Sequence, residues 1–258
     1  MPPDSSPPGS APPPDPAPPP EPAPAGGLAI AAAQAAIVSY GQRMAADRLV
    51  VGAAGNLSIR VGDIIVMSPS GMNYDQVTMD SVNVLDASGA ILSGTGRRSS
   101  EWPMHRRLYD LTPARAVVHT HSPFSVAIGT VADEIPAVHY SILQLGGATV
   151  RVAPYTTFGS DGLAGHAAAA LDGRFAALLQ NHGMIAYGSS IGQAYDRALL
   201  VEWLAEVYWR ARLAGTPRIL DAAELEAVTQ AARQHRYRGA GEDAQGPADA
   251  GRPGGPET

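Results

Sequence analysis

The stretch AVVHTHSP, residues 116–123, has the pattern of a short buried strand that ends at Pro123. Because side chains alternate between the two faces of a strand, His119 and His121 point the same way. Two imidazoles on one face at a strand end can bind one divalent metal ion, and Zn²⁺ usually takes three or four protein ligands. The simpler alternative is a pair of histidines that form hydrogen bonds in a half-buried strand.

Strand and helix patterns on both sides of this stretch predict one α/β domain over residues 28–238. Strands are expected at residues 57–60, 64–67, 81–86, 116–121, 149–152, 176–179 and 184–187. Helices are expected at residues 28–47, 99–110, 161–171, 191–213 and 221–233, with a short helix from Pro123 and mixed structure over 135–147. Strands that come singly and in hairpins between helices predict a sheet covered on both faces, mixed or mostly antiparallel.

The two ends of the chain differ in composition from this domain. Residues 1–27 hold 13 of the 23 prolines, and residues 239–258 are rich in glycine, proline and aspartate. Such segments cannot bury enough apolar surface to offset the entropy of ordering, so both are predicted to be disordered tails.

Composition argues against several classes of protein. The net charge of −6 does not favour binding to nucleic acid or to an acidic membrane. No apolar run approaches the roughly 20 residues of a membrane span, and the N-terminus lacks the pattern of a secretory signal. With no cysteine in the chain, disulfides and thiol catalysis are excluded, and we expect a cytoplasmic protein.

The chain also contains no lysine, since all 18 basic residues are arginine. A Schiff base requires a lysine amine, so covalent carbonyl chemistry of that kind is excluded. A protein of this composition that activates a carbonyl must use a metal ion or hydrogen bonds.

Two further residues extend the candidate metal site. His182 lies in the turn QNHG, residues 180–183, and can close a tripod with His119 and His121, although a histidine in a turn often has no such role. Three histidines with one open position are typical of catalytic zinc. Glu101 lies at a predicted helix start, where it is either a capping acid or a displaceable fourth ligand that acts as a general base.

Small polar residues in loops and at helix starts offer hydroxyl, amide and backbone N–H donors that suit a phosphate without lysine. They are Asn56, Ser70, Gly71, Ser99 and Ser100. Arg97 and Arg98 are interpreted as solvated, and His105, His166 and His235 as structural, although His105 falls one helical turn after Glu101 and could support it. The Tyr140 hydroxyl could donate a proton, or the ring could pack in the core or an interface.

Five spaced motifs resemble the class II aldolase/adducin family over about residues 28–235. They are GNLS at 55–58, SPSG at 68–71, SSEWPMH at 99–105, HTH at 119–121 and QNHG at 180–183. Within the family, IPAVHY at 135–140, the glycine pair 146–147 and APYTTFG at 153–159 are most similar to enzymes that cleave L-fuculose 1-phosphate.

The resemblance implies a three-layer αβα sandwich and one Zn²⁺ per subunit on His119, His121 and His182, with Glu101 as displaceable ligand and base. It implies that the five small polar residues named above bind phosphate, and that Tyr140 donates a proton in a neighbouring subunit's site of a homotetramer. The implied reaction is cleavage of a ketose 1-phosphate to dihydroxyacetone phosphate and a small aldehyde. Ser70 departs from the threonine of the fuculose enzymes, and Tyr237 stands where a C-terminal tyrosine would cover the site.

Three alternatives remain open at this point. The aldehyde could come from a 5-deoxy- or methylthio-pentulose phosphate, with unchanged chemistry. The same site could serve an epimerase, a decarboxylase or a dehydratase, although an epimerase is expected to carry aspartate in place of Glu101. A non-enzymatic adducin-like binding module is the third, and the intact metal ligands argue against it.

Overall fold

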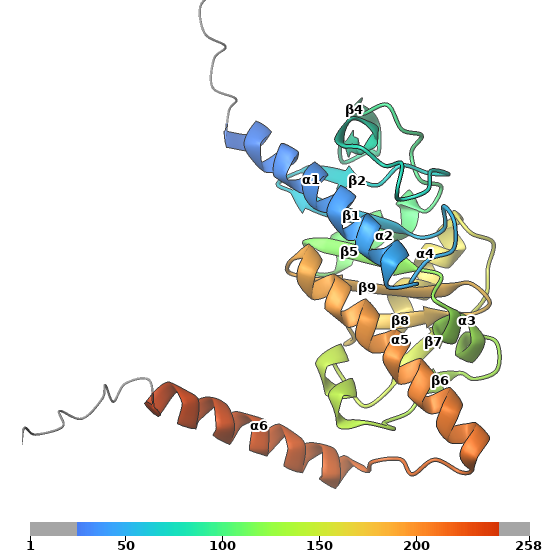
Figure 1. Cartoon of the computed structure of the whole chain (residues 1–258), viewed down its shortest axis with the longest axis vertical. Helices are drawn as coiled ribbons and strands as arrows, with labels where there is room; N and C mark the ends of the chain where they lie inside the picture. Colours follow the sequence, from blue (N-terminus) through green and yellow to red (C-terminus); the bar gives the residue numbers. More distant parts are fainter. Residues whose placement is uncertain (1–24, 243–258) are drawn as a thin grey trace, which may run out of the picture.

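The computed structural model describes residues 25–242, with side chains through residue 234. Within this part of the chain nine strands form one sheet, in the order β4-β3-β2-β1-β5-β9-β8-β7-β6 (Figure 1). The strands are β1 (Asn56–Val61), β2 (Ile64–Met67), β3 (Asn83–Leu85), β4 (Ile91–Ser93), β5 (Ala116–Thr120), β6 (Glu134–Ile135), β7 (Val150–Ala153), β8 (Ala176–Leu179) and β9 (Gly183–Gly188). All neighbouring strands are antiparallel except β7 and β8, which confirms the predicted mixed, mostly antiparallel sheet.

Helices cover both faces of this sheet. They are α1 (Ala25–Ala46), α2 (Trp102–Leu111), α3 (Pro123–Gly129), α4 (Asp161–Ala170), α5 (Ile191–Ala214) and α6 (Ala222–Glu242), with short 3₁₀ helices at η1 (Met79–Ser81) and η2 (Tyr140–Leu145). Helices α1, α3 and α5 pack on one face, whereas α2 and α4 pack together on the other. The three-layer αβα sandwich is therefore confirmed, and α6 extends away from the sheet (Figure 1).

The apolar core follows the alternation of side chains along the strands. In β5, Val118 faces α5 and Val117 faces the α2 side, and both are fully buried. Because β5 lies between β1 and β9, its backbone is hydrogen-bonded on both edges. The strand that carries the first candidate metal ligand is thus held at the centre of the domain.

The helix expected over residues 99–110 begins later in the structure, as α2 at Trp102. Its N-cap is Glu101, which makes no side-chain capping hydrogen bond, and Pro103 stands in the first turn. The Ser99 hydroxyl instead accepts a hydrogen bond of 3.1 Å from the Glu101 backbone N–H. The predicted start at residue 99 was therefore wrong, and the Glu101 carboxylate is directed toward the histidines rather than toward the helix backbone.

Other differences concern short elements and boundaries. The strand β4 was not predicted, since three exposed residues carry no periodic signal. The strand expected over residues 81–86 is limited to β3, because η1 occupies its start. Helix α1 begins at Ala25 and α6 runs to Glu242, so both extend past the predicted domain ends.

Several predictions fall outside the described parts of the chain. Residues 1–24 and 243–258 lie outside, as do the side chains of His235 and Tyr237. Among residues 25–242, no helix is both long and apolar enough to cross a membrane.

Candidate metal centre

His119 lies near the end of β5, opposite Asn56 in β1, and its side chain is fully buried. Its Nδ1 atom is 2.8 Å from the carbonyl oxygen of Met184. Because a carbonyl oxygen can only accept, Nδ1–H donates this hydrogen bond, and the ring in its neutral form presents the lone pair of Nε2. That lone pair faces the other candidate ligands.

His121 and His182 complete a group of three rings. His121 follows the end of β5, and its backbone N–H donates to the Leu49 carbonyl oxygen at 3.1 Å. His182 lies in the turn between β8 and β9, after Asn181, whose φ of 53° gives the chain its sharp bend. The Nε2 atoms of His119 and His121 are 3.0 Å apart, and the ring centroids of all three lie 4.8 to 4.9 Å from one another.

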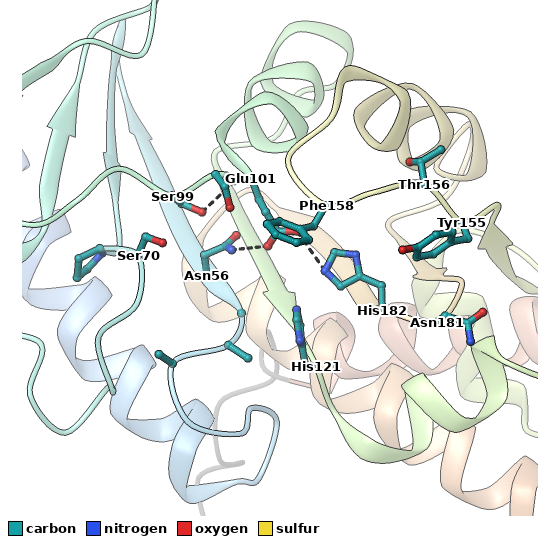
Figure 2. Close-up of a pocket in the computed structure, with 15 residues that line it drawn as sticks. Asn56, Ser70, Ser99, Glu101, His121, Tyr155, Thr156, Phe158, Asn181 and His182 are labelled. Carbon is teal, nitrogen blue, oxygen red and sulfur yellow. Dashed lines mark hydrogen bonds and ion pairs between the residues drawn. The ribbon is translucent and has the colours of Figure 1, made fainter.

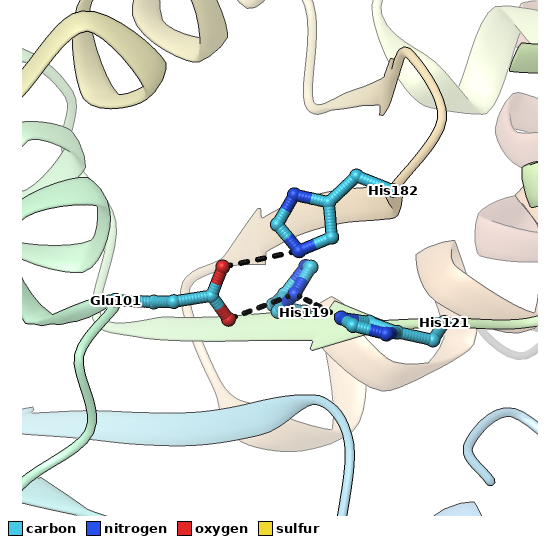
Figure 3. A group of neighbouring side chains, drawn as sticks. All are labelled: Glu101, His119, His121 and His182. Atoms are coloured by element: carbon cyan, nitrogen blue, oxygen red, sulfur yellow. Dashed lines mark hydrogen bonds and ion pairs between the residues drawn. The ribbon is translucent and has the colours of Figure 1, made fainter. Parts of the chain in front are cut away.

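Glu101 faces these rings from the start of α2 (Figure 3). Its Oε2 atom is 3.0 Å from Nε2 of His119, and its Oε1 atom is 3.1 Å from Nε2 of His182. Burial raises the pKa of Glu101, but the adjacent His119 and His182 imidazoles outweigh that effect and hold the pKa well below its usual range. The carboxylate is therefore ionised.

The four side chains fit a divalent metal ion. One ligand atom from each of Glu101, His119, His121 and His182 lies within 4.8 Å of the others. Burial lowers the pKa of His119, but the Glu101 carboxylate more than offsets this and raises it, so the centre favours a positive charge. Burial and the neighbouring rings lower the pKa of His121 to about 3, which leaves it in the neutral form that binds metal. Three imidazoles and one carboxylate are donors that suit zinc and similar divalent ions.

A cavity of about 350 Å³ opens beside this centre (Figure 2). Of the residues predicted to bind phosphate, four line it: Asn56, Ser70, Ser99 and Ser100. Gly71 does not line it; its φ of 71° shapes the adjacent turn, and an added Cβ would come within 3.3 Å of the Arg97 guanidinium. The metal centre and the polar loops thus share one cavity.

Part of the cavity wall was not among the predicted site residues. It includes Ala53, Ala54, Pro69, Tyr155, Thr156, Phe158 and Asn181. The exposed fractions of Tyr155 and Phe158 are 59% and 66%, and both residues follow the end of β7. Two aromatic residues in a loop directly after a strand were a usable signal, because loops at strand ends commonly bind ligands.

The loop that carries these aromatic residues is held by hydrogen bonds. The Tyr155 backbone N–H donates to Gln180 Oε1 at 2.9 Å, and Nδ1 of His166 lies 3.1 Å from the Pro154 carbonyl oxygen. His166 therefore contributes to the loop and lies outside the metal centre.

Tyr140 does not line the cavity within its own chain. It begins η2, its side chain is 52% exposed, and its ring packs against His139 with centroids 4.3 Å apart. Its predicted role as a proton donor in a neighbouring subunit stays a prediction.

His105 does not contact the Glu101 carboxylate directly, although the two residues are one helical turn apart. It is fully buried and hydrogen-bonded to both Asn56 and Ser58. Burial, with a smaller effect from His119, lowers the pKa of His105 to about 3, so its ring is neutral.

The fold and this site together define a class, that of α/β enzymes with a metal centre of three histidines and one carboxylate. Residues 35–209 match the model of the class II aldolase and adducin N-terminal domain, and the chain belongs to this family. It is a class II aldolase, a type of lyase that depends on a metal ion.

Individual relatives agree with this membership. A 5-methylthioribulose-1-phosphate/5-deoxyribulose-1-phosphate aldolase of Rhodospirillum rubrum is 40% identical over 197 residues, which cover 76% of this chain and 86% of that protein. An L-fuculose phosphate aldolase of Escherichia coli K12 is 40% identical over 158 residues, which cover 61% of this chain and 73% of that protein. A solved L-fuculose 1-phosphate aldolase superposes with a TM-score of 0.74 at 31% identity, covering 78% of this chain and 96% of that one.

Proposed function

We propose that this protein cleaves a ketose 1-phosphate reversibly into dihydroxyacetone phosphate and a small aldehyde. The observation that carries the proposal is a Glu/His₃ centre that opens into a cavity lined by hydroxyl and amide groups. The relatives named above act on phosphorylated sugars. The absence of lysine excludes the Schiff-base route to the same products.

In this proposal, His119, His121 and His182 would hold one Zn²⁺ per subunit, and Glu101 would be a displaceable fourth ligand. The bound metal ion would supply Lewis-acid stabilisation of the negative charge that develops on the substrate oxygen. Glu101 would act as the base that moves the proton on the carbon that becomes the methylene of dihydroxyacetone phosphate. Its buried, ionised carboxylate beside the centre supports this role.

The phosphate is proposed to bind to Asn56, Ser70, Gly71, Ser99 and Ser100. Side chains of four of them line the cavity, next to the N-terminus of α2. Hydroxyls, an amide and backbone N–H groups can hold a dianion without a cationic side chain. Binding of this remote group would orient the reacting carbons and lower the barrier by positioning.

We propose that the aldehyde end of the substrate lies against Tyr155 and Phe158. Their rings provide an apolar wall that suits a terminal methyl or methylthio group. This favours a 5-deoxypentulose or 5-methylthiopentulose 1-phosphate, in agreement with the similarity to the R. rubrum enzyme over 76% of the chain. L-Fuculose 1-phosphate is the second candidate, supported by the motifs over residues 135–159 and by the structural likeness to the fuculose enzyme.

Tyr140 is proposed to exchange a proton with the aldehyde oxygen in the site of a neighbouring subunit of a homotetramer. Its exposure, and the fact that it does not line the cavity of its own chain, support a role between subunits. Mixing Glu101→Gln and Tyr140→Phe subunits would partly restore cleavage in hybrid tetramers verified by native mass spectrometry. Hybrids without recovered activity would contradict this placement.

A panel of three substrates tests the proposed function. The metal-loaded protein is incubated with 5-deoxyribulose, 5-methylthioribulose or L-fuculose 1-phosphate, and release of dihydroxyacetone phosphate is followed. We expect higher kcat/KM for the two 5-substituted pentulose phosphates than for L-fuculose 1-phosphate. Epimerised, decarboxylated or dehydrated products without dihydroxyacetone phosphate would overturn the aldolase proposal.

A further inference from the structure

A strip of buried polar side chains lies between β1 and α2, directly behind the metal centre. The residues of β1 on the face toward α2 are polar: Asn56 and Ser58 are buried, and Arg60 at the outer end is exposed. Glu101, the N-cap of α2, and His105 and Tyr109 within the helix lie four residues apart, and they face these residues of β1. Two residues of strand advance about as far as one turn of helix, so these two rows stay in register.

Hydrogen bonds connect this strip into one chain that ends on Glu101. Nδ2 of Asn56 donates to Oε2 of Glu101 at 2.8 Å, and Oδ1 of Asn56 is 2.5 Å from Nε2 of His105. On the other side of the ring, Nδ1 of His105 is 2.7 Å from Oγ of Ser58, which is 2.7 Å from the Tyr109 hydroxyl. All five residues are buried, and none is more than 6% exposed.

The ionised carboxylate determines the direction of every donor in this chain. Because a carboxylate only accepts, the Asn56 amide must present its NH₂ group to Glu101 and its oxygen to His105. The oxygen also only accepts, so the neutral His105 ring carries its proton on Nε2, and its Nδ1 accepts from the Ser58 hydroxyl. Ser58 is then the acceptor for the Tyr109 hydroxyl. Beyond Tyr109, at the end of the strip far from Glu101, the Arg60 guanidinium donates a hydrogen bond of 3.1 Å to the backbone carbonyl oxygen of Tyr109.

The two oxygens of Glu101 are not equivalent as a result. Oε2 accepts the Asn56 hydrogen bond, whereas Oε1 is buried and has no hydrogen-bond partner among the described residues. Oε1 lies 3.1 Å from Nε2 of His182, and Oε2 lies 3.0 Å from Nε2 of His119, so the Asn56 hydrogen bond is what distinguishes the two oxygens.

We propose that His105 is a positioning residue that acts through Asn56 to hold Oε2 of Glu101, so that Oε1 is the oxygen that takes the substrate proton. The inference rests on the proposed function, because it assigns the atom that performs the proton transfer there. In the condensation direction, the C–H bond at the dihydroxyacetone phosphate methylene breaks, the proton passes to Oε1, and the electron pair stays with the substrate. Solvent exchange then replaces the proton on Oε1 before it returns to carbon.

Packing requirements alone do not explain the strip. An apolar contact between a strand and a helix is at least as stable as a buried polar one, and it leaves no donor or acceptor that must be matched. Hydrogen bonds differ from apolar contacts in being directional, so they can hold one rotamer of a carboxylate. A catalytic group needs that restriction because small misplacements reduce the rate strongly.

Two substitutions of His105 separate positioning from a merely structural role. The terminal amide of asparagine reaches the place of Nδ1, so His105→Asn keeps the contact with Ser58 and loses the one with Asn56. The longer glutamine reaches the place of Nε2, so His105→Gln keeps a donor toward Asn56 and loses the contact with Ser58. Both variants are neutral and both remove ring volume, so they are matched for packing.

The readout is exchange of the dihydroxyacetone phosphate methylene proton with solvent deuterium, measured at full metal occupancy and with thermal stability recorded for each variant. We expect His105→Asn to lower kcat for exchange about 10- to 100-fold, the range for a buried acceptor left without its donor, here Oδ1 of Asn56. KM is measured beside kcat, because Asn56 also lines the cavity and is proposed to bind phosphate, and the proposal requires the fall in kcat. We expect His105→Gln to stay within about threefold of the wild type. Equal losses in the two variants, or a rise in KM alone, would overturn the proposal.

A second measurement does not depend on activity. In protein with ¹⁵N-labelled histidine, long-range ¹H–¹⁵N spectra distinguish the two neutral tautomers, and the His105 signals are those lost in both variants. We expect Nε2–H for His105, and an Nδ1–H form would overturn the proposal whatever the exchange rates. If the wild type exchanges no proton at all while His105 is in the Nε2–H form, the proposed function fails but the chain of donors stands.

Discussion

The two faces of the central sheet differ in chemistry as well as in the helices that cover them. On the face under α1 and α5, the side chains that meet the sheet form one continuous apolar cluster. On the face under α2, the apolar cluster includes residues of β2, β3 and β5 but none of β1, where Asn56 and Ser58 are buried beside His105 of α2 instead. The first face buries apolar side chains, and the second places hydrogen-bonding groups around Glu101.

The two kinds of contact differ physically, because hydrogen bonds depend on direction and apolar contacts do not. Apolar burial stabilises in proportion to area and tolerates small shifts, because it has no preferred angle. A buried hydrogen bond requires its partner within a few tenths of an ångström, and its loss leaves an uncompensated polar group. Substitutions on the two faces should therefore have different consequences, with stability lost on one and activity on the other.

The largest effect is expected at the centre itself, for His119→Ala. This change removes one of the three proposed histidine ligands, so metal affinity should fall more than about 100-fold, beyond the range for residues that only support a ligand. Elemental analysis after gel filtration measures bound metal, and circular dichroism checks folding. Full metal occupancy in a folded variant would contradict the ligand set; His166→Ala, outside the centre, is the control and should keep the metal.

A smaller loss is expected for Glu101→Gln, which keeps the shape of the side chain and removes the base. Proton exchange of dihydroxyacetone phosphate should slow by about 10²- to 10⁴-fold, the usual contribution of a general acid or base. The histidines are unchanged, so the metal should remain bound. Wild-type exchange rates in this variant would mean that another residue moves the proton.

On the apolar face, Ile37→Ala should affect stability and leave the chemistry unchanged. Ile37 is fully buried in α1, and truncation of such a side chain costs about 2 to 5 kcal/mol of unfolding free energy through lost burial and a cavity. Urea titration measures the loss, and kcat should be unchanged where the variant is folded. Leu28→Ala on the same helix is the control, because Leu28 is 65% exposed and should change stability little.

The smallest effect is expected for a polar pair on the solvent side of α2. Arg106 and Asp110 form an ion pair of 2.9 Å between side chains that are 37% and 48% exposed. Since water screens such pairs, Asp110→Asn should cost no more than about 0.5 kcal/mol in unfolding free energy. A loss above about 1 kcal/mol would show that exposure is a poor guide to the energy of polar pairs on this helix.

The prediction of the fold succeeded where the signal was local and repeated. The short, mostly apolar stretch that ends at Pro123 and the helical spacing in residues 191–213 were sufficient to place β5 and α5. It failed where the element was too short for a period, as in β4, or where a tertiary contact competed with a local one, as at the start of α2. There the carboxylate that a helix would use as an ordinary capping acid faces the histidines instead.

The sequence alone determined which chemical groups are present and which are absent. The HTH motif, the histidine of the QNHG turn, one glutamate at a helix start and the lack of lysine were sufficient to predict a family, a fold and a metal-dependent carbonyl chemistry. These features depend on residue type and short spacing, which can be read along the chain.

Only the tertiary structure decided which groups act on one another. Asn56, predicted to bind phosphate, also donates to Glu101, and His105, interpreted as structural, is linked to it through Asn56. Asn56 and Glu101 are 45 residues apart in sequence, so no local pattern relates them. Their contact arises because α2 lies against β1, as the hydrogen bonds of Ser58 with His105 and Tyr109 show, and hydrogen-bond direction has meaning only after those elements are in place.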